Sequence, residues 1–373
     1  MRIGVDTRLL YYERGGISQY ISQLISALGE IDQENQYHLF SSRKIKEDYR
    51  PNGSSNFYQH PVWTPSHNRF ERWAFAIEVA PYHLDVLHSP DFIPPAFGAR
   101  RRLITVHDLN FLLFPEYVSP ESHQYYTQQI KWAVDKADHI SADSHHTKAD
   151  LIELMQLSPD KITTIHLAAK SVFTQVQSQT AINATLEKYN LPNGFILFVG
   201  TLSPRKNART LIHAYYHMLH ESRIDVPLVL IGSKGWQYEE LASTIKELKL
   251  SKYIQVLNNI YDEDLARLYS AAGVFALPSY YEGFGLPPLE AMHCGCPVVV
   301  SDRGSLPEVV GDAGIILDPD DVEQWAETLV LVLTNQEVRK SLVSAGSTQA
   351  KKFSWQKTAK ATLKLYNLVT NFV

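Results

Sequence analysis

Short apolar segments alternate with amphipathic ones along the whole chain. In the first half, apolar runs rich in β-branched residues predict buried strands at residues 2–6, 37–40, 86–88, 103–107, 139–142 and 162–166. In the second half, similar runs predict strands at residues 195–199, 228–231, 254–257, 274–277, 298–300 and 314–317. Strands that alternate with helices in this way form parallel sheets covered by helices on both faces. The pattern therefore predicts an α/β protein with two doubly wound sheets.

Two helices and a linker complete this prediction. Apolar residues recur every three or four positions from Ile17 to Leu28, which indicates a helix packed on the first sheet. The segment at residues 355–373 has a similar spacing and follows no further strand, so we expect a terminal docking helix. Residues 171–194 are polar and end in Pro-Asn-Gly, which favours a linker between the two sheets.

The composition fits a globular protein and excludes several classes. Hydrophobic residues make up 45% of the 373 positions and charged residues 20%, which excludes a disordered or fibrous chain. The formal net charge of -5 argues against nucleic acid as a partner. The first ten residues do not resemble a secretory signal, and two cysteines are too few for a disulfide framework. We therefore expect a cytoplasmic protein.

Gly15 and Gly16 stand between the first predicted strand and the helix that starts near Ile17. Glycine lets the backbone approach a ligand closely, and the N-terminus of a helix attracts anions, so a phosphate fits this place. A glycine loop without a ligand is an equal alternative. The segment is not a GxGxxG fingerprint, which argues against a nicotinamide-dependent dehydrogenase.

Two cations follow the strand predicted at residues 195–199. Arg205 and Lys206 come after Gly200, just before a helix predicted at residues 207–220. Open parallel sheets bind nucleotides at the carboxyl ends of their strands, and paired cations bind phosphates there. We expect a diphosphate site, with a solvated pair of loop charges as the alternative.

The segment from Pro278 to Glu290 carries the strongest signal. A predicted strand ends at Pro278, a loop with Glu282 and Gly285 follows, and Pro287 suits the first turn of a new helix. Carboxylates accept hydrogen bonds from hydroxyl groups, so the two glutamates suit a ribose and a hexose on either side of a diphosphate. The alternatives are a helix-dipole or capping role for Glu290 and a solvated loop position for Glu282.

One histidine stands at the carboxyl end of a predicted strand in the first half. His107 ends the strand predicted at residues 103–107, where it can face a ligand or serve the structure. Asp108 follows it and suits the capping of the next turn.

Together these segments resemble the retaining glycosyltransferases of family four. Residues 282–290 resemble the E-x7-E motif of that family, and residues 200–207 resemble its diphosphate-binding segment. The opening strand with Gly15 and Gly16 resembles the family's first strand and glycine loop. The resemblance covers nearly the whole chain, but Thr201 stands where many relatives have an arginine, so phosphate charge rests more heavily on Arg205 and Lys206.

The resemblance implies the GT-B fold, which has two facing Rossmann-like, doubly wound domains and a C-terminal helix that crosses back to the first. It implies that residues 1–185, with the helix at 355–373, bind the acceptor. Residues 186–354 would then bind the nucleotide-sugar donor.

The resemblance also implies a role for each site residue. The expected catalytic residues are Glu282, which would hold the transferred hexose, and His107, which would lie beside the reacting sugar. Arg205 and Lys206 would hold the diphosphate, Glu290 the ribose, and backbone N–H groups the rest of the donor. The expected donor-binding residues are therefore Gly16, Arg205, Lys206, Phe284, Gly285, Leu286 and Glu290.

The implied activity is transfer of a hexose, with retention of anomeric configuration, from UDP-glucose or GDP-mannose. The acceptor would be a glycan or a lipid-linked sugar in polysaccharide biosynthesis. The leaving phosphate would accept the acceptor's proton on the same face of the sugar. An epimerase of the same fold and a non-catalytic two-domain sugar-binding protein are the alternatives.

No cofactor is expected, and no metal is needed for the donor. His293, Cys294 and Cys296 lack the spacing of a zinc site, and the acidic string at residues 318–321 fits a turn that caps a helix. The basic triplet at residues 100–102 is either a solvated face or a peripheral contact with the inner face of a membrane.

Overall fold

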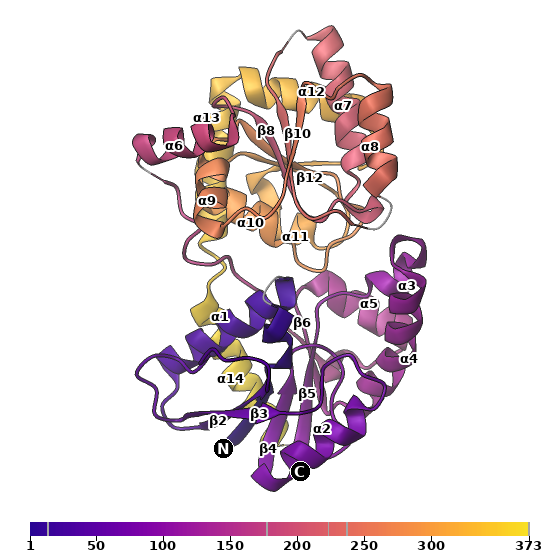
Figure 1. Cartoon of the computed structure of the whole chain (residues 1–373), viewed down its shortest axis with the longest axis vertical. Coiled ribbons are helices and arrows are strands. Elements are labelled where there is room, and N and C mark those ends of the chain that lie inside the picture. The colour runs from indigo at the N-terminus through magenta and orange to yellow at the C-terminus, as the bar shows by residue number, and fades with distance from the viewer. Residues whose placement is uncertain (13–14, 177, 223, 236–237, 372–373) are drawn as a thin grey trace. The chain divides into compact units, whose positions relative to one another are not determined.

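The computed structural model describes residues 1–12, 15–176, 178–222, 224–235 and 238–371. It divides into two compact units, drawn in Figure 1. Unit 1 comprises Met1–Leu112, Pro120–Leu167 and Ser354–Val373, and unit 2 comprises Leu113–Ser119 and Ala168–Phe353.

The division between the units differs from the boundary expected between residues 185 and 186. That boundary falls inside helix α6 (Gln179–Tyr189), which belongs to unit 2. Ile182 and Leu186 of α6 are buried, and the helix packs against α9 (Asp262–Ala271). The polar segment expected to be a linker therefore contains a helix, because its few apolar residues are spaced to cover one side of unit 2.

Unit 1 contains a parallel sheet whose strand order is β3-β2-β1-β4-β5-β6-β7. The strands are β1 (Arg2–Asp6), β2 (Gln36–Ser42), β3 (Phe57–Val62), β4 (Leu84–Ser89), β5 (Ala99–Val106), β6 (His139–Ala142) and β7 (Ile162–Thr164). The helices are α1 (Gly16–Ile31), α2 (Glu71–Val79), α3 (Asn110–Leu113), α4 (Pro120–Lys136), α5 (His145–Met155) and α14 (Trp355–Asn371). Strand β3 was not predicted; it contains Pro61 and lies at the sheet edge, where a missing N–H group is tolerated.

Unit 2 contains a second parallel sheet, with the order β10-β9-β8-β11-β12-β13. Its strands are β8 (Ile196–Val199), β9 (Leu228–Ile231), β10 (Ile254–Leu257), β11 (Val274–Leu277), β12 (Val298–Ser301) and β13 (Ile315–Leu317). Besides α6 and α9, its helices are α7 (Ala208–Glu221), α8 (Tyr238–Glu247), α10 (Leu286–His293), α11 (Leu306–Val310), α12 (Val322–Thr334) and α13 (Gln336–Ala350). The strands in the centre of the sheet are buried on both faces, as their unbroken apolar runs predict.

The strand orders determine where each sheet can bind a ligand. In unit 2 the chain starts at β8 and moves outward to β10, then returns to β11 beside β8 and moves the other way. In unit 1 the same reversal lies between β1 and β4. The loops after these neighbouring strands diverge, which leaves a crevice outside the carboxyl ends of the strands. A site is therefore expected after β8 and β11 in unit 2, and after β1 and β4 in unit 1.

The C-terminal helix belongs to unit 1, as expected, where the yellow α14 lies beside the indigo α1 (Figure 1). A buried hydrogen-bonded chain secures it to the sheet. Tyr366 of α14 lies 2.8 Å from His88 Nδ1, and the other ring nitrogen of His88 lies 2.8 Å from the Thr105 hydroxyl. Thr105 in turn lies 3.2 Å from the hydroxyl of Tyr20 on α1. Burial lowers the pKa of His88 to about 3, so this imidazole is neutral.

Candidate active site

The carboxyl edge of the unit 2 sheet brings together the two segments singled out in the sequence. The loop after β8 forms a short turn of 3-10 helix that carries Arg205 and Lys206. The loop after β11 carries Glu282, and the backbone N–H of Tyr280 donates to the carbonyl of Arg205 over 2.8 Å. Because β8 and β11 are neighbours in the sheet, residues 76 positions apart in sequence meet at this edge.

Glu282 is buried at this edge among hydrogen-bond donors. Its Oε1 accepts hydrogen bonds from the Lys206 ammonium and, over 2.7 Å, from the Ser279 hydroxyl. Its Oε2 lies 3.6 Å from the Arg205 guanidinium, which also donates to the carbonyl of Tyr281 over 2.5 Å. The two cations expected to hold a diphosphate are therefore paired with the carboxylate expected to hold a sugar.

The charges in this cluster leave it positive. Burial alone raises the pKa of Glu282, but Lys206, Arg205 and the hydrogen bond from Ser279 outweigh it and hold that pKa below its usual range. Glu282 is thus ionised at neutral pH. Two cations and one carboxylate give a net charge of +1, so the edge attracts an anion without leaving the carboxylate unpaired.

Two residues that the sequence analysis did not identify hold the Glu282 loop in place. The hydroxyl of Ser305 donates to the carbonyls of Glu282 and Phe284, over 2.9 and 2.6 Å. Gly304 has a φ of 61°, and a Cβ there would lie 2.7 Å from the backbone nitrogen and oxygen of Glu282. Only glycine fits so close to the loop. No sequence motif marks Ser279, Gly304 and Ser305, so their contacts with the Glu282 loop are recognised only in the structure.

The remaining expected donor-binding residues of unit 2 lie at the start of α10. This helix begins at Leu286, with Pro287 and Pro288 in its first turn and Gly285 before it at a φ of 99°. Since the prolines carry no N–H, Gly285 and Leu286 supply backbone donors at this end. The ring of Phe284 is buried.

Glu290 lies inside α10 and is also buried, and its Oε2 accepts a hydrogen bond from the Tyr269 hydroxyl over 3.2 Å. It belongs to the interior of the helix and not to its N-cap, which is Gly285. The capping alternative for Glu290 is therefore wrong.

Gly16, the donor-binding residue expected in unit 1, begins α1, and Gly15 is its N-cap. Both glycines are exposed, and a Cβ built at either would meet no atom within 4 Å. Among the described residues, packing therefore leaves room for a side chain at these positions.

His107 lies directly after β5 and is held at both ring nitrogens. Nδ1 is 2.6 Å from the Asp143 carboxylate and Nε2 is 2.7 Å from the carbonyl of Pro90. Both partners only accept hydrogen bonds, so the ring is an imidazolium. Burial lowers its pKa, but the charge and hydrogen bond of Asp143 outweigh that effect and raise the pKa to about 9. Asp108 accepts from the N–H of Asn110 over 3.1 Å, which is the turn capping expected for it.

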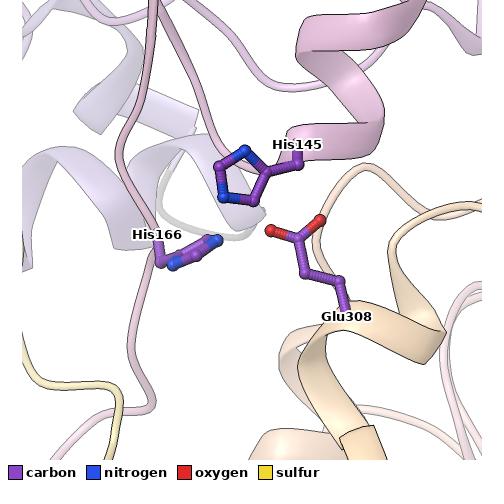
Figure 2. Close-up of side chains that lie close together, drawn as sticks. All are labelled: His145, His166 and Glu308. Atoms are coloured by element: carbon purple, nitrogen blue, oxygen red, sulfur yellow. The ribbon is translucent and has the colours of Figure 1, made fainter.

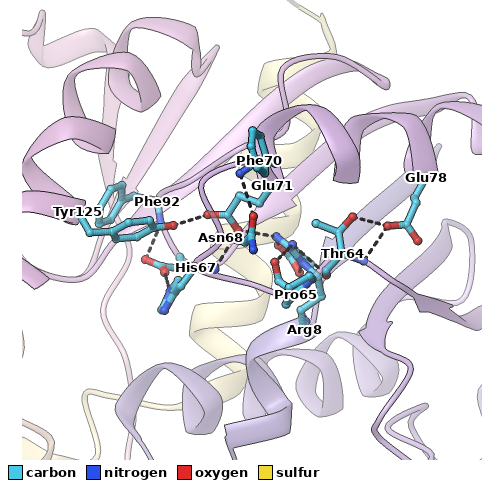
Figure 3. A network of polar contacts seen from close by, with 12 residues as sticks. Arg8, Thr64, Pro65, His67, Asn68, Phe70, Glu71, Glu78, Phe92 and Tyr125 are labelled. Carbon is cyan, nitrogen blue, oxygen red and sulfur yellow. Dashed lines mark hydrogen bonds and ion pairs between the residues drawn. The ribbon is translucent and has the colours of Figure 1, made fainter. Parts of the chain in front are cut away.

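A polar network that the sequence analysis did not predict lies after β1 and β3 in unit 1 (Figure 3). The buried Arg8 guanidinium pairs with Asp6 at 2.7 Å and with Glu71 at 3.3 Å, and it lies over the ring of Phe75. Glu71 also accepts from the Tyr125 hydroxyl over 2.5 Å and from the N–H of His67 over 3.1 Å. These contacts fix the loop before α2.

The same loop presents a more accessible pair at the carboxyl edge of unit 1. His67 Nε2 lies 2.7 Å from Asp91 Oδ2 in the loop after β4, and Asp91 Oδ1 accepts from the N–H of Phe92 over 2.8 Å. His67 packs edge-on to the ring of Tyr126. Burial lowers the pKa of His67, but Asp91 outweighs it and raises that pKa. The sheet edge in unit 1 thus combines a carboxylate, an imidazole and an aromatic ring.

The residues weighed as metal ligands lie elsewhere. Within the described ranges His293, Cys294 and Cys296 do not gather into a three-residue ligand group, and burial raises the pKa of both thiols. His145 and His166, shown in Figure 2, lie edge to face with 5.5 Å between ring centroids. Both belong to unit 1, and Glu308, drawn in the same figure, belongs to unit 2. Asp321 caps α12 by accepting from the N–H of Gln324 over 3.0 Å, as expected for the acidic string.

Comparison with known families agrees with this fold. The family model described as Glycosyltransferase Family 4 matches residues 14–169, and the model described as Glycosyl transferases group 1 matches residues 183–349. Two doubly wound parallel sheets of this kind are the architecture of the GT-B fold. The chain belongs to the family 4 type of these glycosyltransferases.

Individual relatives support the same assignment. The O-antigen chain mannosyltransferase B of Escherichia coli is 32% identical over 99% of this chain and 100% of that protein. The serotype-specific mannosyltransferase WbdA of Escherichia coli is 34% identical over 68% of this chain, which spans only 32% of WbdA. The structure of sucrose-phosphate synthase from Thermosynechococcus elongatus has a TM-score of 0.77 and 22% identity, covers 99% of both chains, and shows the same fold.

The chain is therefore a glycosyltransferase. In the part of the chain that the structure describes, every helix is too short or too polar to cross a lipid bilayer.

Proposed function

We propose that this glycosyltransferase moves mannose from GDP-mannose to a glycan or lipid-linked sugar, with retention of anomeric configuration and without a metal ion. The names of the two mannosyltransferase relatives favour GDP-mannose over UDP-glucose, the other expected donor. The observation that carries the proposal is the cluster of Arg205, Lys206 and Glu282 at the unit 2 sheet edge, in which Lys206 and Glu282 are buried.

The cluster suits a donor with a diphosphate next to a sugar. The diphosphate binds Arg205 and Lys206, with further hydrogen bonds from the backbone N–H groups of Gly285 and Leu286. Lys206 then shares its charge between phosphate and Glu282, which keeps the carboxylate ionised and able to accept hydrogen bonds from hexose hydroxyls. Glu290 holds the ribose hydroxyls in the same way.

The proposed reaction takes place on one face of the sugar. The bond between the anomeric carbon and the phosphate oxygen breaks, and the acceptor oxygen bonds to that carbon. The acceptor's proton passes to the leaving phosphate, and the nucleoside diphosphate departs. Lys206 and Arg205 stabilise the charge that develops on the phosphate, while Glu282 positions the hexose and does not attack it. The cations supply the electrostatic role that a metal ion plays elsewhere.

His107 acts in this proposal as a fixed cation and not as a general base. Its two ring nitrogens already donate to Asp143 and to the carbonyl of Pro90, so it has no lone pair with which to take a proton. An imidazolium near the transferred sugar favours negative charge on the departing phosphate. The acceptor sugar binds in unit 1, where Asp91 accepts hydroxyl hydrogen bonds and Tyr126 offers a ring face.

A transfer assay with chelator tests the proposal. The purified protein is incubated with GDP-mannose or UDP-glucose, a mannoside acceptor and EDTA. The one-bond coupling constant between C1 and H1 of the transferred sugar, measured by NMR, then gives the anomeric configuration of the product. The proposal expects an α-linked product from GDP-mannose, unaffected by EDTA. A β-linked product would exclude retention, and loss of activity with EDTA would exclude a metal-independent reaction. Transfer from UDP-glucose alone would exclude GDP-mannose as the donor. An epimerase would change the sugar of the donor in the absence of an acceptor. A non-catalytic binding protein would convert neither GDP-mannose nor UDP-glucose.

A further inference from the structure

Helix α2 in unit 1 is apolar on both sides, although one side faces solvent. Toward the core it buries Phe75, Ala76 and Val79. On the outer side Trp73 is 63% exposed and Ile77 is 66% exposed. A surface helix normally carries polar residues on its outer face, so this helix is built to be covered on both sides.

The exposed apolar surface extends beyond α2. Phe70 precedes Trp73 by three positions and Ile77 follows by four, so the three side chains lie along one face of the helix. Phe97 lies beside Trp73, with 6.4 Å between ring centroids. On the other flank Trp63 is 72% exposed, and its backbone N–H donates to Glu78 of α2 over 2.7 Å.

Two cations lie directly on aromatic rings of this surface. The guanidinium of Arg43 stacks on Trp63 at 3.6 Å, and that of Arg69 stacks on Phe70 at 4.5 Å. Lys44 and Lys46 continue the exposed basic segment that begins at Arg43.

Two nearby carboxylates, Glu78 and Asp48, have partners, and with the exposed Glu47 the segment at residues 43–50 carries four cations against two carboxylates. The Glu78 carboxylate accepts hydrogen bonds from the backbone N–H and the hydroxyl of Thr64 (Figure 3). It also accepts one from the backbone N–H of Trp63. Asp48 pairs with Arg50 at 2.6 Å. The surface is therefore aromatic and apolar in its centre and basic at its rim.

We infer that this surface, formed by Trp63, Phe70, Trp73, Ile77 and Phe97 with Arg43, Lys44 and Arg69, docks onto an anionic lipid bilayer. Tryptophan and phenylalanine enter the boundary between headgroups and acyl chains, and the cations bind lipid phosphates. A protein partner would need an apolar patch surrounded by acidic residues to match this surface. A bilayer with anionic headgroups supplies both an apolar interior and negative charge. The inference concerns a surface outside the proposed active site and does not depend on the proposed activity.

Vesicle flotation tests the inference without donor or acceptor. Full-length protein is mixed with vesicles of equal parts phosphatidylethanolamine and phosphatidylglycerol, or with vesicles of phosphatidylcholine alone. We expect binding to the first and weak binding to the second, reduced by salt because the headgroup charge is screened. Equal binding to both vesicles, or none to either, overturns the inference.

Two variants locate the binding surface. The double variant Trp73→Ser with Ile77→Ser should weaken binding to the anionic vesicles about tenfold or more, because it removes the inserted side chains. Arg43→Glu with Lys44→Glu leaves the apolar face intact and should weaken binding by roughly the same factor through charge. The matched control is Leu331→Ser with Leu368→Ser, which removes exposed leucines elsewhere, on α12 and α14, and should leave binding unchanged.

Thermal unfolding and sedimentation distinguish bilayer docking from misfolding and from self-association. Thermal unfolding should show the same midpoint for the wild type and the two variants of this surface, since their changed side chains are exposed, and it checks that the control variant, whose leucines are about half exposed, is folded. If the control loses binding as strongly as Trp73→Ser with Ile77→Ser, the surface is misassigned. If sedimentation shows a dimer that this α2 variant dissociates while vesicle binding stays intact, the occupant is a second copy of the chain and the inference is wrong.

Discussion

The carboxyl edges of the two sheets share a topology but carry opposite chemistry. In unit 2 the crevice between β8 and β11 holds two cations around one carboxylate, Glu282. In unit 1 the crevice between β1 and β4 is rich in carboxylates, with Asp6, Glu71 and Asp91 balanced by Arg8 and His67. The sheet order thus determines where each unit has a crevice, and the side chains determine which chemical groups that crevice suits. A phosphate suits the first edge and hydroxyl groups suit the second.

The two edges also use their buried charges differently. Glu282 is kept ionised by neighbouring cations, so it remains an acceptor for hydroxyl groups. In unit 1 Asp143 serves the opposite purpose, because it keeps the His107 ring protonated. One edge therefore maintains an anion in a cationic setting, and the other maintains a cation in an acidic setting. Breaking each pair separately tests this difference.

The largest effect is expected from Glu282→Gln. The amide keeps the side-chain volume but loses the charge that accepts sugar hydroxyls and balances Lys206. Transfer should fall by about a hundredfold or more, while the dissociation constant for the nucleoside diphosphate changes little or improves. Initial rates and calorimetric titration measure the two quantities. Glu323→Gln on the exposed start of α12 is the control, and unchanged transfer by Glu282→Gln would remove Glu282 from the site.

In unit 1, Asp143→Asn should lower the pKa of His107, because the carboxylate that raises it is lost, and so change the pH dependence of both stability and transfer. The folded pKa of about 9 lies above the usual 6.5, so the ion pair stabilises the protein fully below pH 6.5. That stabilisation, roughly 3 kcal/mol, is lost as pH rises through 9. In the variant the loss should be absent, and the alkaline limb of the transfer rate should move to lower pH. Urea unfolding at several pH values measures the stability, and initial rates at the same pH values measure the transfer.

The surface pair around Asp138 supplies the control for that experiment. Asp138→Asn removes a carboxylate paired with Arg101 at 3.1 Å but leaves His107 untouched. It should keep the wild-type pH dependence. An Asp143→Asn protein with the same dependence as the wild type would show that His107 is not held as a cation.

Lys206→Ala should weaken both donor binding and transfer, which separates it from Glu282→Gln. Loss of a charge-assisted hydrogen bond to phosphate corresponds to a loss in affinity of about tenfold to a hundredfold. Lys252→Ala, on the exposed surface of the same unit, should change neither quantity. If Lys206→Ala lowers transfer but leaves the affinity for GDP intact, Lys206 does not contact the diphosphate.

The smallest effect is expected from Tyr366→Phe in α14. The variant loses the hydroxyl that contacts His88 and leaves a buried ring nitrogen without that partner. The free energy of unfolding should fall by about 1–2 kcal/mol. Tyr189→Phe in unit 2, whose hydroxyl bonds Asp264 near the surface, should cost less than about 0.5 kcal/mol. Equal costs would mean that the buried chain does not anchor the terminal helix.

Much of the fold could be predicted because its signals are local. The apolar runs placed all strands but β3, and Pro287 placed the start of α10 inside the segment from Glu282 to Glu290. The pairing of Lys206 with Glu282 could not be predicted, since it depends on β8 and β11 being neighbours. The partner of His107 was missed for the same reason, because Asp143 follows a different strand. Arg8 and His67 belong to a network whose members are distant in sequence and match no motif.

The central claim is that the unit 2 edge binds a guanosine diphosphate sugar through its cations, without a metal ion. The most direct measurement is the thermal stability of the wild type and of Lys206→Ala with GDP-mannose, GDP, UDP-glucose and UDP, all in EDTA. A ligand at about 100 times its dissociation constant stabilises a protein by roughly 2.7 kcal/mol. We predict that GDP-mannose and GDP stabilise the wild type in EDTA and that Lys206→Ala loses most of this effect. Stabilisation by the uridine compounds alone, or an equal effect on the variant, would contradict the claim.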